Sequence, residues 1–284
     1  MRTIEKILVA LDLTSTDEEL IRYASFLADK LQPKKVYFVH NIKKYEISEL
    51  FKEQLKDLDL EKMISDELDE KVANHFDAKT DSEVLISEDP YTESLINYVV
   101  HKYSIDLVIV GNKSRKKGTG VISEKLMRLL KCDILSVPKN ASQRIDKIWA
   151  GTDFSRESIK SLQRASYLAN NTGAEITAIN IYNVPIQFTP YLEKEEMLPK
   201  IEKHTREKFE KFLHRNKITD CEIKIIRGRE ASVAAKLSTE SENAGADLVI
   251  VADKGGNVFS SLLVGSVTDE LFSRSLKIPL WVTK

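Results

Sequence analysis

Small and polar residues near the C-terminal end of the chain have the spacing of an anion site. Ala252, Asp253, Lys254 and Gly255 are followed by nine residues and then by Gly265, Ser266 and Val267. Glycine has no Cβ, so backbone amides at these positions can approach an anion closely. Residues 265–267 also begin a predicted helix that runs to about Ser275, whose first amides have no intrahelical partner and whose dipole favours phosphate. With the Ser266 hydroxyl and the Lys254 charge added, the segment predicts a phosphate-binding loop.

Two aspartates are the other candidates, because each comes directly after an apolar run in its half of the chain. Asp12 follows the run 7–11, and Asp153 follows the run 147–152. Either carboxylate can contact a ligand or satisfy backbone amides at the turn that follows. The second interpretation is favoured for Asp12, and both stay open for Asp153.

An internal repeat shows where these residues lie in the fold. Asp106–Val110 recurs unchanged as Asp247–Val251, at an offset of 141 residues that also relates Asp12 to Asp153. Near the end of each half the offset becomes 145. The repeat predicts two homologous domains, 1–138 and 146–284, joined by a linker at 139–145.

Each half alternates apolar strands with amphipathic helices. Runs such as 107–110 do not alternate with polar residues, which indicates strands of a parallel sheet covered on both faces. We therefore predict an α/β fold with two doubly wound, five-stranded parallel-sheet sandwiches. The predicted strands are 4–11, 36–40, 84–87, 106–111 and 134–137 in the first half, and 147–152, 175–181, 222–227, 247–252 and 280–282 in the second. Ligands of such sheets bind beyond the carboxyl ends of the strands, where the aspartates and the glycines would meet.

The pattern Gly-x2-Gly-x9-Gly-Ser/Thr after a fourth strand, with Asp closing the first strand, resembles the nucleotide-binding signature of the universal stress proteins. The resemblance covers essentially the whole chain as a tandem pair and implies an adenine nucleotide alpha hydrolase-like fold. It also implies a stress-response regulatory protein that binds ATP or another adenine nucleotide, with or without Mg²⁺, in its C-terminal domain. In nucleotide-binding members the glycines and the Ser/Thr wrap the phosphates, the aspartate meets the adenosine, and an apolar residue ending the second strand lies against adenine.

Carried over to this chain, the resemblance and the spacing predict one set of nucleotide-binding residues. They are Thr152, Asp153, Ile181, Ala252, Lys254, Gly255, Gly265, Ser266 and Val267. Ala252 stands where the signature has its first glycine, which places a methyl group beside the path of the phosphates.

The first half departs further from the signature. Its loop reads Gly111-Asn112-Lys113-Ser114, only five residues precede Gly120, and Val121 replaces the hydroxyl residue. The shortened loop predicts that this domain has lost its phosphate site. A basic cluster at 113–117 is interpreted as a solvated loop.

Composition and missing motifs exclude several classes of protein. Lys+Arg is 43 and Asp+Glu is 44, which gives no electrostatic reason to expect nucleic acid or a membrane surface as a partner. The apolar runs are too short for a membrane span, and two unrelated cysteines indicate reduced thiols in a cytoplasmic protein. The five histidines are scattered, so no metal site is expected.

No catalytic residues are expected either, because neither a Walker loop nor a nucleophile–base arrangement is recognisable. Two alternatives stay open: a tandem scaffold that binds no nucleotide, and a slow ATPase. The predicted fifth strands, 134–137 and 280–282, would be sheet edges, so we expect the two domains to pair through them within the chain, and a homodimer is a further alternative.

Overall fold

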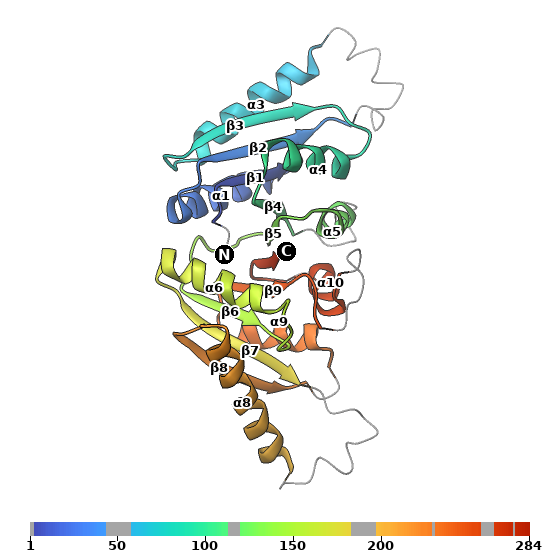
Figure 1. Cartoon of the computed structure of the whole chain (residues 1–284). Helices are drawn as coiled ribbons and strands as arrows, with labels where there is room; N and C mark the ends of the chain where they lie inside the picture. The colour runs from blue at the N-terminus through green and yellow to red at the C-terminus, as the bar shows by residue number, and fades with distance from the viewer. Residues whose placement is uncertain are drawn as a thin grey trace. The chain divides into compact units, whose positions relative to one another are not determined.

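The computed structural model describes residues 3–43, 58–112, 120–182, 197–228, 231–256, 264–274 and 276–284. The chain divides into two compact units, Arg2–Gln143 and Arg144–Lys284 (Figure 1).

The N-terminal unit is a parallel sheet covered by helices on both faces. Its strands lie in the order β3-β2-β1-β4-β5. Helices α1 and α3 pack together on one face, and α4 and α5 pack together on the other (Figure 1). The bounds are β1 Lys6–Leu11, α1 Asp17–Leu31, β2 Lys35–Asn41, α3 Leu60–His75, β3 Asp81–Ser87, α4 Thr92–Tyr103, β4 Leu107–Gly111, α5 Gly120–Leu129 and β5 Asp133–Val137.

The C-terminal unit repeats this arrangement, with its strands in the order β10-β9-β6-β7-β8. Helix α6 lies against β6 and β9, α8 lies against β8, and α9 packs on α10. The bounds are β6 Lys147–Gly151, α6 Ile159–Thr172, β7 Glu175–Tyr182, α8 Met197–Arg215, β8 Cys221–Arg227, α9 Val233–Asn243, β9 Leu248–Ala252, α10 Ser266–Ser273 and β10 Leu280–Thr283. The predicted doubly wound fold is confirmed, and the strand bounds differ from the prediction by at most three residues.

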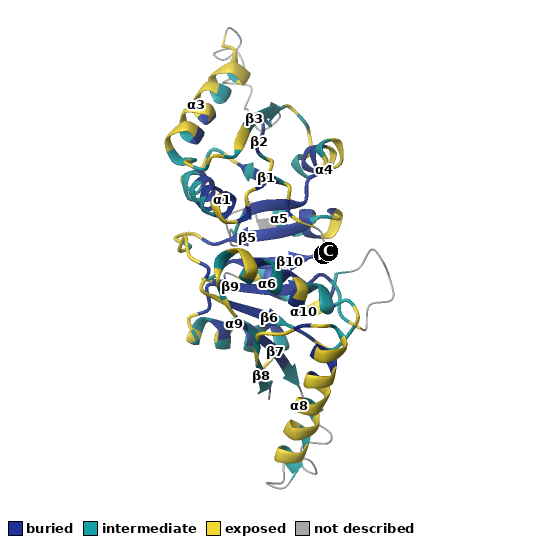
Figure 2. Ribbon diagram, turned by 60° about the vertical axis from the view of Figure 1, so that its left-hand side comes forward, coloured by how far each residue is buried: buried dark blue, intermediate teal, exposed yellow. Residues whose placement is uncertain are grey.

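The cores follow from the sequence patterns. Ile7, Leu8 and Val9 of β1 are successive residues on opposite faces of the sheet, and all three are completely buried. Helix α1 turns Leu20, Ala24 and other apolar residues at helical spacing inward. In Figure 2 the central strands are buried, the outer strands β3 and β8 are mostly intermediate, and the outer faces of α3 and α8 are exposed. The apolar cores on the two faces of each sheet therefore hold the carboxyl ends of the strands in place.

The repeated aspartates Asp106 and Asp247 clamp the start of the central strand in each domain. Asp247 Oδ2 accepts hydrogen bonds from the backbone amides of Asp146 and Lys147, each at 3.0 Å, and Oδ1 accepts one from Arg144 Nη2 at 2.9 Å. In the first domain Asp106 Oδ2 accepts from two amides in the same way, those of residues 5 and 6. In both halves of the duplication, this aspartate therefore holds the start of the central strand, which is β1 in the first domain and β6 in the second.

We expect Asp247→Ala to lower the free energy of unfolding by about 2–3 kcal/mol, because two part-buried amides and a guanidinium lose their charged acceptor. Chemical denaturation of the full chain measures the change. Glu175→Ala, at an exposed residue of the same end of the sheet, is the control and should change stability by less than about 0.5 kcal/mol. An equal loss of unfolding free energy in both variants would contradict this structural role of Asp247.

Candidate functional site

A cavity of about 240 Å³ opens at the carboxyl ends of β6, β7 and β9, beside the first turns of α9 and α10. All of the sequence-predicted residues line it: Thr152, Asp153, Ile181, Ala252, Lys254, Gly255, Gly265, Ser266 and Val267. The fold thus brings together two loops that lie about a hundred residues apart in the sequence. This is the point of the sheet where the winding reverses between β6 and β9.

One end of the cavity is formed by the start of α10. Gly265 precedes the helix, makes no side-chain cap, and donates its amide to the carbonyl of Asp253 at 2.7 Å. The first helical bond runs from the Asp269 amide to the Gly265 carbonyl at 2.9 Å. The amides of Ser266 and Val267, ahead of that bond, have no intrahelical partner. The first turn of α10 therefore favours an anion at this end of the cavity.

The strand end and the helix start are held together by a buried bond. The Thr268 hydroxyl donates to the carbonyl of Ala252 at 2.7 Å. Ala252 itself is buried and lines the cavity. The methyl group expected beside the phosphate path is therefore part of the cavity wall.

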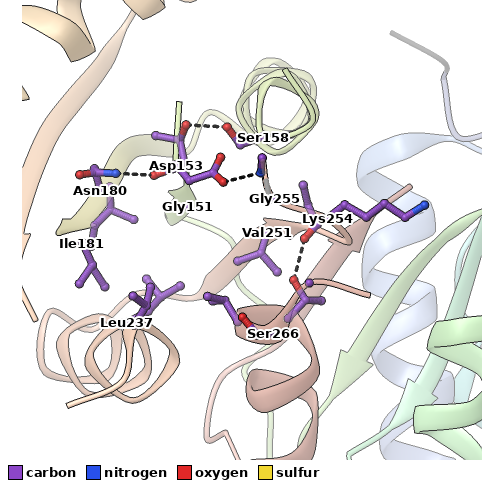
Figure 3. Close-up of a pocket in the computed structure, with 18 residues that line it drawn as sticks. Gly151, Asp153, Ser158, Asn180, Ile181, Leu237, Val251, Lys254, Gly255 and Ser266 are labelled. Atoms are coloured by element: carbon purple, nitrogen blue, oxygen red, sulfur yellow. Dashed lines mark hydrogen bonds between the residues drawn. The ribbon is translucent and has the colours of Figure 1, made fainter. Parts of the chain in front are cut away.

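The carboxylate of Asp153 joins the two loops. Its Oδ2 accepts a hydrogen bond from the Gly256 amide at 2.9 Å (Figure 3). Its Oδ1 accepts one from the Ser155 amide at 3.0 Å. A Cβ added at Gly255 would lie 2.7 Å from Asp153 Oδ2, so a side chain there would displace the carboxylate from this position. Asp153 thus does satisfy backbone amides, and it also faces the cavity.

These bonds change the acidity of Asp153. Partial burial alone would raise its pKa, but hydrogen bonds from Ser155, the Gly256 amide and Ser158 outweigh it, and the pKa lies below its ordinary value. The carboxylate is therefore ionised at neutral pH and is a weak base.

A lowered pKa in the folded state stabilises the fold above the ordinary pKa of Asp, near about 4, and this contribution is lost as the pH falls through the folded value. We expect Asp153→Asn to be less stable than the parent chain at neutral pH and to approach it on acidification. Free energies of unfolding for both chains, between about pH 3 and pH 7, measure this. A difference that stays constant with pH would contradict the assignment.

The loop that carries Asp153 is supported by Thr152. The Thr152 and Ser158 hydroxyl oxygens lie 2.8 Å apart, and the Phe154 amide donates to Thr152 Oγ1 at 3.0 Å. Asn180 Nδ2 donates to the Thr152 carbonyl at 2.8 Å. Thr152 is buried, so its hydroxyl positions the loop.

The opposite end of the cavity is apolar. Ile181 of β7 and Leu237 of α9 face each other across it (Figure 3). Ile179, Val233 and Val251 complete this wall. The cavity therefore has an apolar slot at one end and a helix N-terminus at the other.

Several of these residues were missed from the sequence: Ser158, Asn180, Val233, Leu237, Val251, Gly256 and Thr268. Val233 and Leu237 had a usable signal, since they are four residues apart on the helix that follows the third strand. The other residues could not be predicted in this way, because they line the cavity only once the ends of particular strands are brought together.

Lys254 lines the cavity, but its side chain extends away from Asp153 and Ile181 (Figure 3). The predicted positive charge therefore lies outside the apolar slot in this arrangement.

The shortened loop from which we predict that the first domain has lost its phosphate site falls mainly on residues 113–119, which lie outside the described residues, as do 257–263 of the second domain. Asp12 is described: its Oδ1 accepts a bond from the Thr14 hydroxyl at 2.7 Å, and its amide donates to the buried Asp17 carboxylate at 3.1 Å.

Within the described ranges, no three His, Cys, Asp or Glu side chains are grouped so that they could hold a metal ion. None of the helices in those ranges is long and apolar enough to cross a membrane.

Known structures share this architecture. A universal stress protein from Archaeoglobus fulgidus DSM 4304 matches with 15% identity and a TM-score of 0.66, over 99% of this chain and 97% of that one. A structure from Pseudomonas aeruginosa UCBPP-PA14 that carries the same family name matches with 16% identity and a TM-score of 0.68, over 99% and 93%. A universal stress protein in complex with cAMP matches 49% of this chain and 96% of its own, with 22% identity and a TM-score of 0.34.

No curated protein sequence matches significantly. The family model of the universal stress proteins matches twice, over residues 3–138 and 144–284. With both of its halves matched, the chain belongs to the universal stress protein family.

Proposed function

We propose that the C-terminal domain binds an adenine nucleotide and that the chain acts as a nucleotide-responsive regulatory protein of the stress response. The observation that carries the proposal is the cavity with two unlike ends. Its apolar slot, between Ile181 and Leu237, suits a flat base, and its other end offers the first amides of α10 to phosphate.

The residues at the phosphate end fit such a ligand. At Gly265 an added Cβ would lie in van der Waals contact, 3.4 Å from both the Asp253 carbonyl oxygen and the Gly255 amide nitrogen, so only a side chain larger than a methyl group would crowd the loop. The Ser266 side chain is exposed at the cavity mouth and can donate its hydroxyl. A Mg²⁺ ion would be held chiefly by the phosphate oxygens, which are the hard ligands that this ion prefers.

Asp153 favours a binding role over hydrolysis. It is the one carboxylate among the described residues that line the cavity, and its two oxygens already accept the Ser155 and Gly256 amides. A carboxylate with a lowered pKa is a poor general base. The chain's own residues therefore bind and orient the nucleotide, and regulation would follow by mass action, because the ligand favours the loop arrangement that it contacts.

Native mass spectrometry and calorimetry of the full chain test this proposal with ATP, ADP and AMP. Binding of one nucleotide per chain supports it. Binding of two would contradict the restriction to one domain, and no binding would leave the tandem scaffold as the function.

Two further assignments follow from the sequence analysis. We propose that β5 and β10, the edge strands in the order of each unit, pair within the chain, because unpaired apolar edges favour strand addition. Small-angle scattering that shows a single compact particle would support the pairing, and independently moving domains would contradict it. Cys132 and Cys221 form no disulfide, which fits the proposed cytoplasmic location.

A further inference from the structure

The N-terminal domain has a cavity of about 500 Å³ at the equivalent place in its own sheet. Strand register gives the correspondence between the domains. Ala10 pairs with Val39 just as Gly151 pairs with Ile179, so His40 occupies the position of Asn180. The next residue, Asn41, takes the place of Ile181.

The cavity reaches toward α3 past Leu13, where the second domain carries an aromatic ring at the corresponding residue, Phe154. Phe154 packs edge-to-face on Phe209 and Phe212 of α8, with ring centroids 5.1 and 5.7 Å apart. Leu13 stands at the position of Phe154, and neither the offset of 141 nor the offset of 140 given by strand register puts an aromatic residue at the positions of Phe209 and Phe212. Beside Leu13 the cavity extends to Leu60 and Ile64 of α3, whereas in the second domain a separate hollow of about 340 Å³ lies between Phe154 and α8.

The lining is mainly apolar. It includes Leu11, Leu20, Ile42, Ile96, Val110 and Leu126, which come from strands and helices on several sides. Such a surface gains little from a strongly hydrated ligand and favours an apolar one.

Its polar side chains are largely engaged with the protein. Asn41 donates to the Asp89 carbonyl and to the Thr92 hydroxyl, each at 2.9 Å, and accepts from the Asp89 amide at 2.9 Å. Asn41 therefore fastens the loop before α4 and replaces the apolar wall that Ile181 forms in the second domain. The Asp12 carboxylate and the Lys43 ammonium group both line the cavity, so their formal charges cancel and the cavity has no net charge that would favour an anion.

His40 supplies the polar contact for a ligand. It is 8% exposed, and its Nδ1 lies 3.1 Å from the Leu11 carbonyl oxygen, which can only accept, so Nδ1 carries the hydrogen. Burial lowers the pKa of His40, although the Leu11 carbonyl, Asp12 and Glu67 act in the opposite direction. The ring is therefore neutral at physiological pH, and Nε2 is a hydrogen-bond acceptor.

We propose that this cavity binds an uncharged, mainly apolar small molecule that donates one hydrogen bond to His40 Nε2. The site is independent of the nucleotide proposed for the C-terminal domain. The duplicated chain would then carry two sites for two chemically different ligands on one architecture.

The uncharged fluorophore N-phenyl-1-naphthylamine, which has a single N–H donor and brightens in apolar surroundings, is a suitable probe. We expect the full chain to bind it and Leu13→Phe to bind it at least about tenfold more weakly, since the ring fills the opening toward α3. Position 13 accepts this change, because its φ of 60° matches the 64° of Phe154, which carries the ring in the other domain. The control Val233→Phe narrows the nucleotide cavity and should leave the probe unaffected.

A second variant, Ile64→Phe at a half-buried position of α3, should also weaken probe binding. No binding to the parent chain, equal binding to Leu13→Phe and Ile64→Phe, or displacement of the probe by ATP would each overturn the proposal.

The N-methylated probe, which has no donor, tests the role of His40. It should bind the parent chain several-fold more weakly than N-phenyl-1-naphthylamine, and His40→Leu should abolish this preference. A preference that survives in His40→Leu would overturn the assigned hydrogen bond.

Discussion

Replacing Gly265 with valine is expected to weaken adenine nucleotide binding about 100-fold, which corresponds to the loss of one or two hydrogen bonds from backbone amides to a charged group. The cause is steric. A Cβ at this position already meets the Asp253 carbonyl and the Gly255 amide at 3.4 Å, and a branched side chain adds two methyl groups between α10 and the loop. Calorimetric titration of the full chain measures the change.

Ser273→Val is the matched control, because it places the same residue at the last position of the same helix, away from the free amides. Its affinity for nucleotide should equal that of the parent chain. If Gly265→Val binds as tightly as Ser273→Val, the amides of α10 do not hold the phosphates. If both variants lose binding equally, the effect comes from damage to the helix and the assignment also fails.

Phe209→Ala is expected to destabilise the C-terminal domain by about 3–5 kcal/mol, the usual cost of removing a completely buried aromatic side chain. It should also weaken nucleotide binding. Phe209 packs against Phe154, whose backbone has a positive φ of 64° and follows directly on Asp153. Without that ring, the strained loop loses the packing that holds the Asp153 carboxylate against the Gly256 amide. Denaturation and calorimetry on one variant measure both effects.

Leu68→Ala, at the corresponding position of α3, separates the two effects. Leu68 is also completely buried, so its loss should cost about 2–5 kcal/mol. Because it belongs to the N-terminal unit, nucleotide affinity should not change. Unchanged affinity in Phe209→Ala, or reduced affinity in Leu68→Ala, would show that the aromatic packing does not support the site.

The two domains have the same backbone arrangement but different side chains in their interiors. Phe154 and Leu13 both adopt a positive φ after an aspartate, so the turn is the same in each domain. What differs is the volume of the side chain that the turn directs toward the long helix. In the second domain three rings pack together and leave a separate hollow of about 340 Å³ against α8, whereas in the first domain the cavity itself reaches α3 past Leu13.

The sequence alone determined the fold class and the position of the site. Runs such as 107–110, apolar at every residue, predict strands covered on both faces, and the repeat of this run predicts the second domain. The spacing of Gly255, Gly265 and Ser266 identified a segment that lines the cavity, and its role in binding an anion stays a prediction. These signals are legible because they lie within a few residues of one another and depend on local periodicity and on the absence of a Cβ.

Only the tertiary structure showed which side chains line each cavity. The bond between Asp153 and Gly256, the wall of Val233 and Leu237, and the Asn41 bonds to residues 89 and 92 join segments far apart in the sequence. The repeat offset of 141 would align His40 with Ile181, but strand register shifts this pair by one residue and aligns Asn41 instead. A one-residue shift in a strand exchanges the side chain that faces the ligand, and no local pattern encodes it, because register is set by packing against strands and helices elsewhere in the domain.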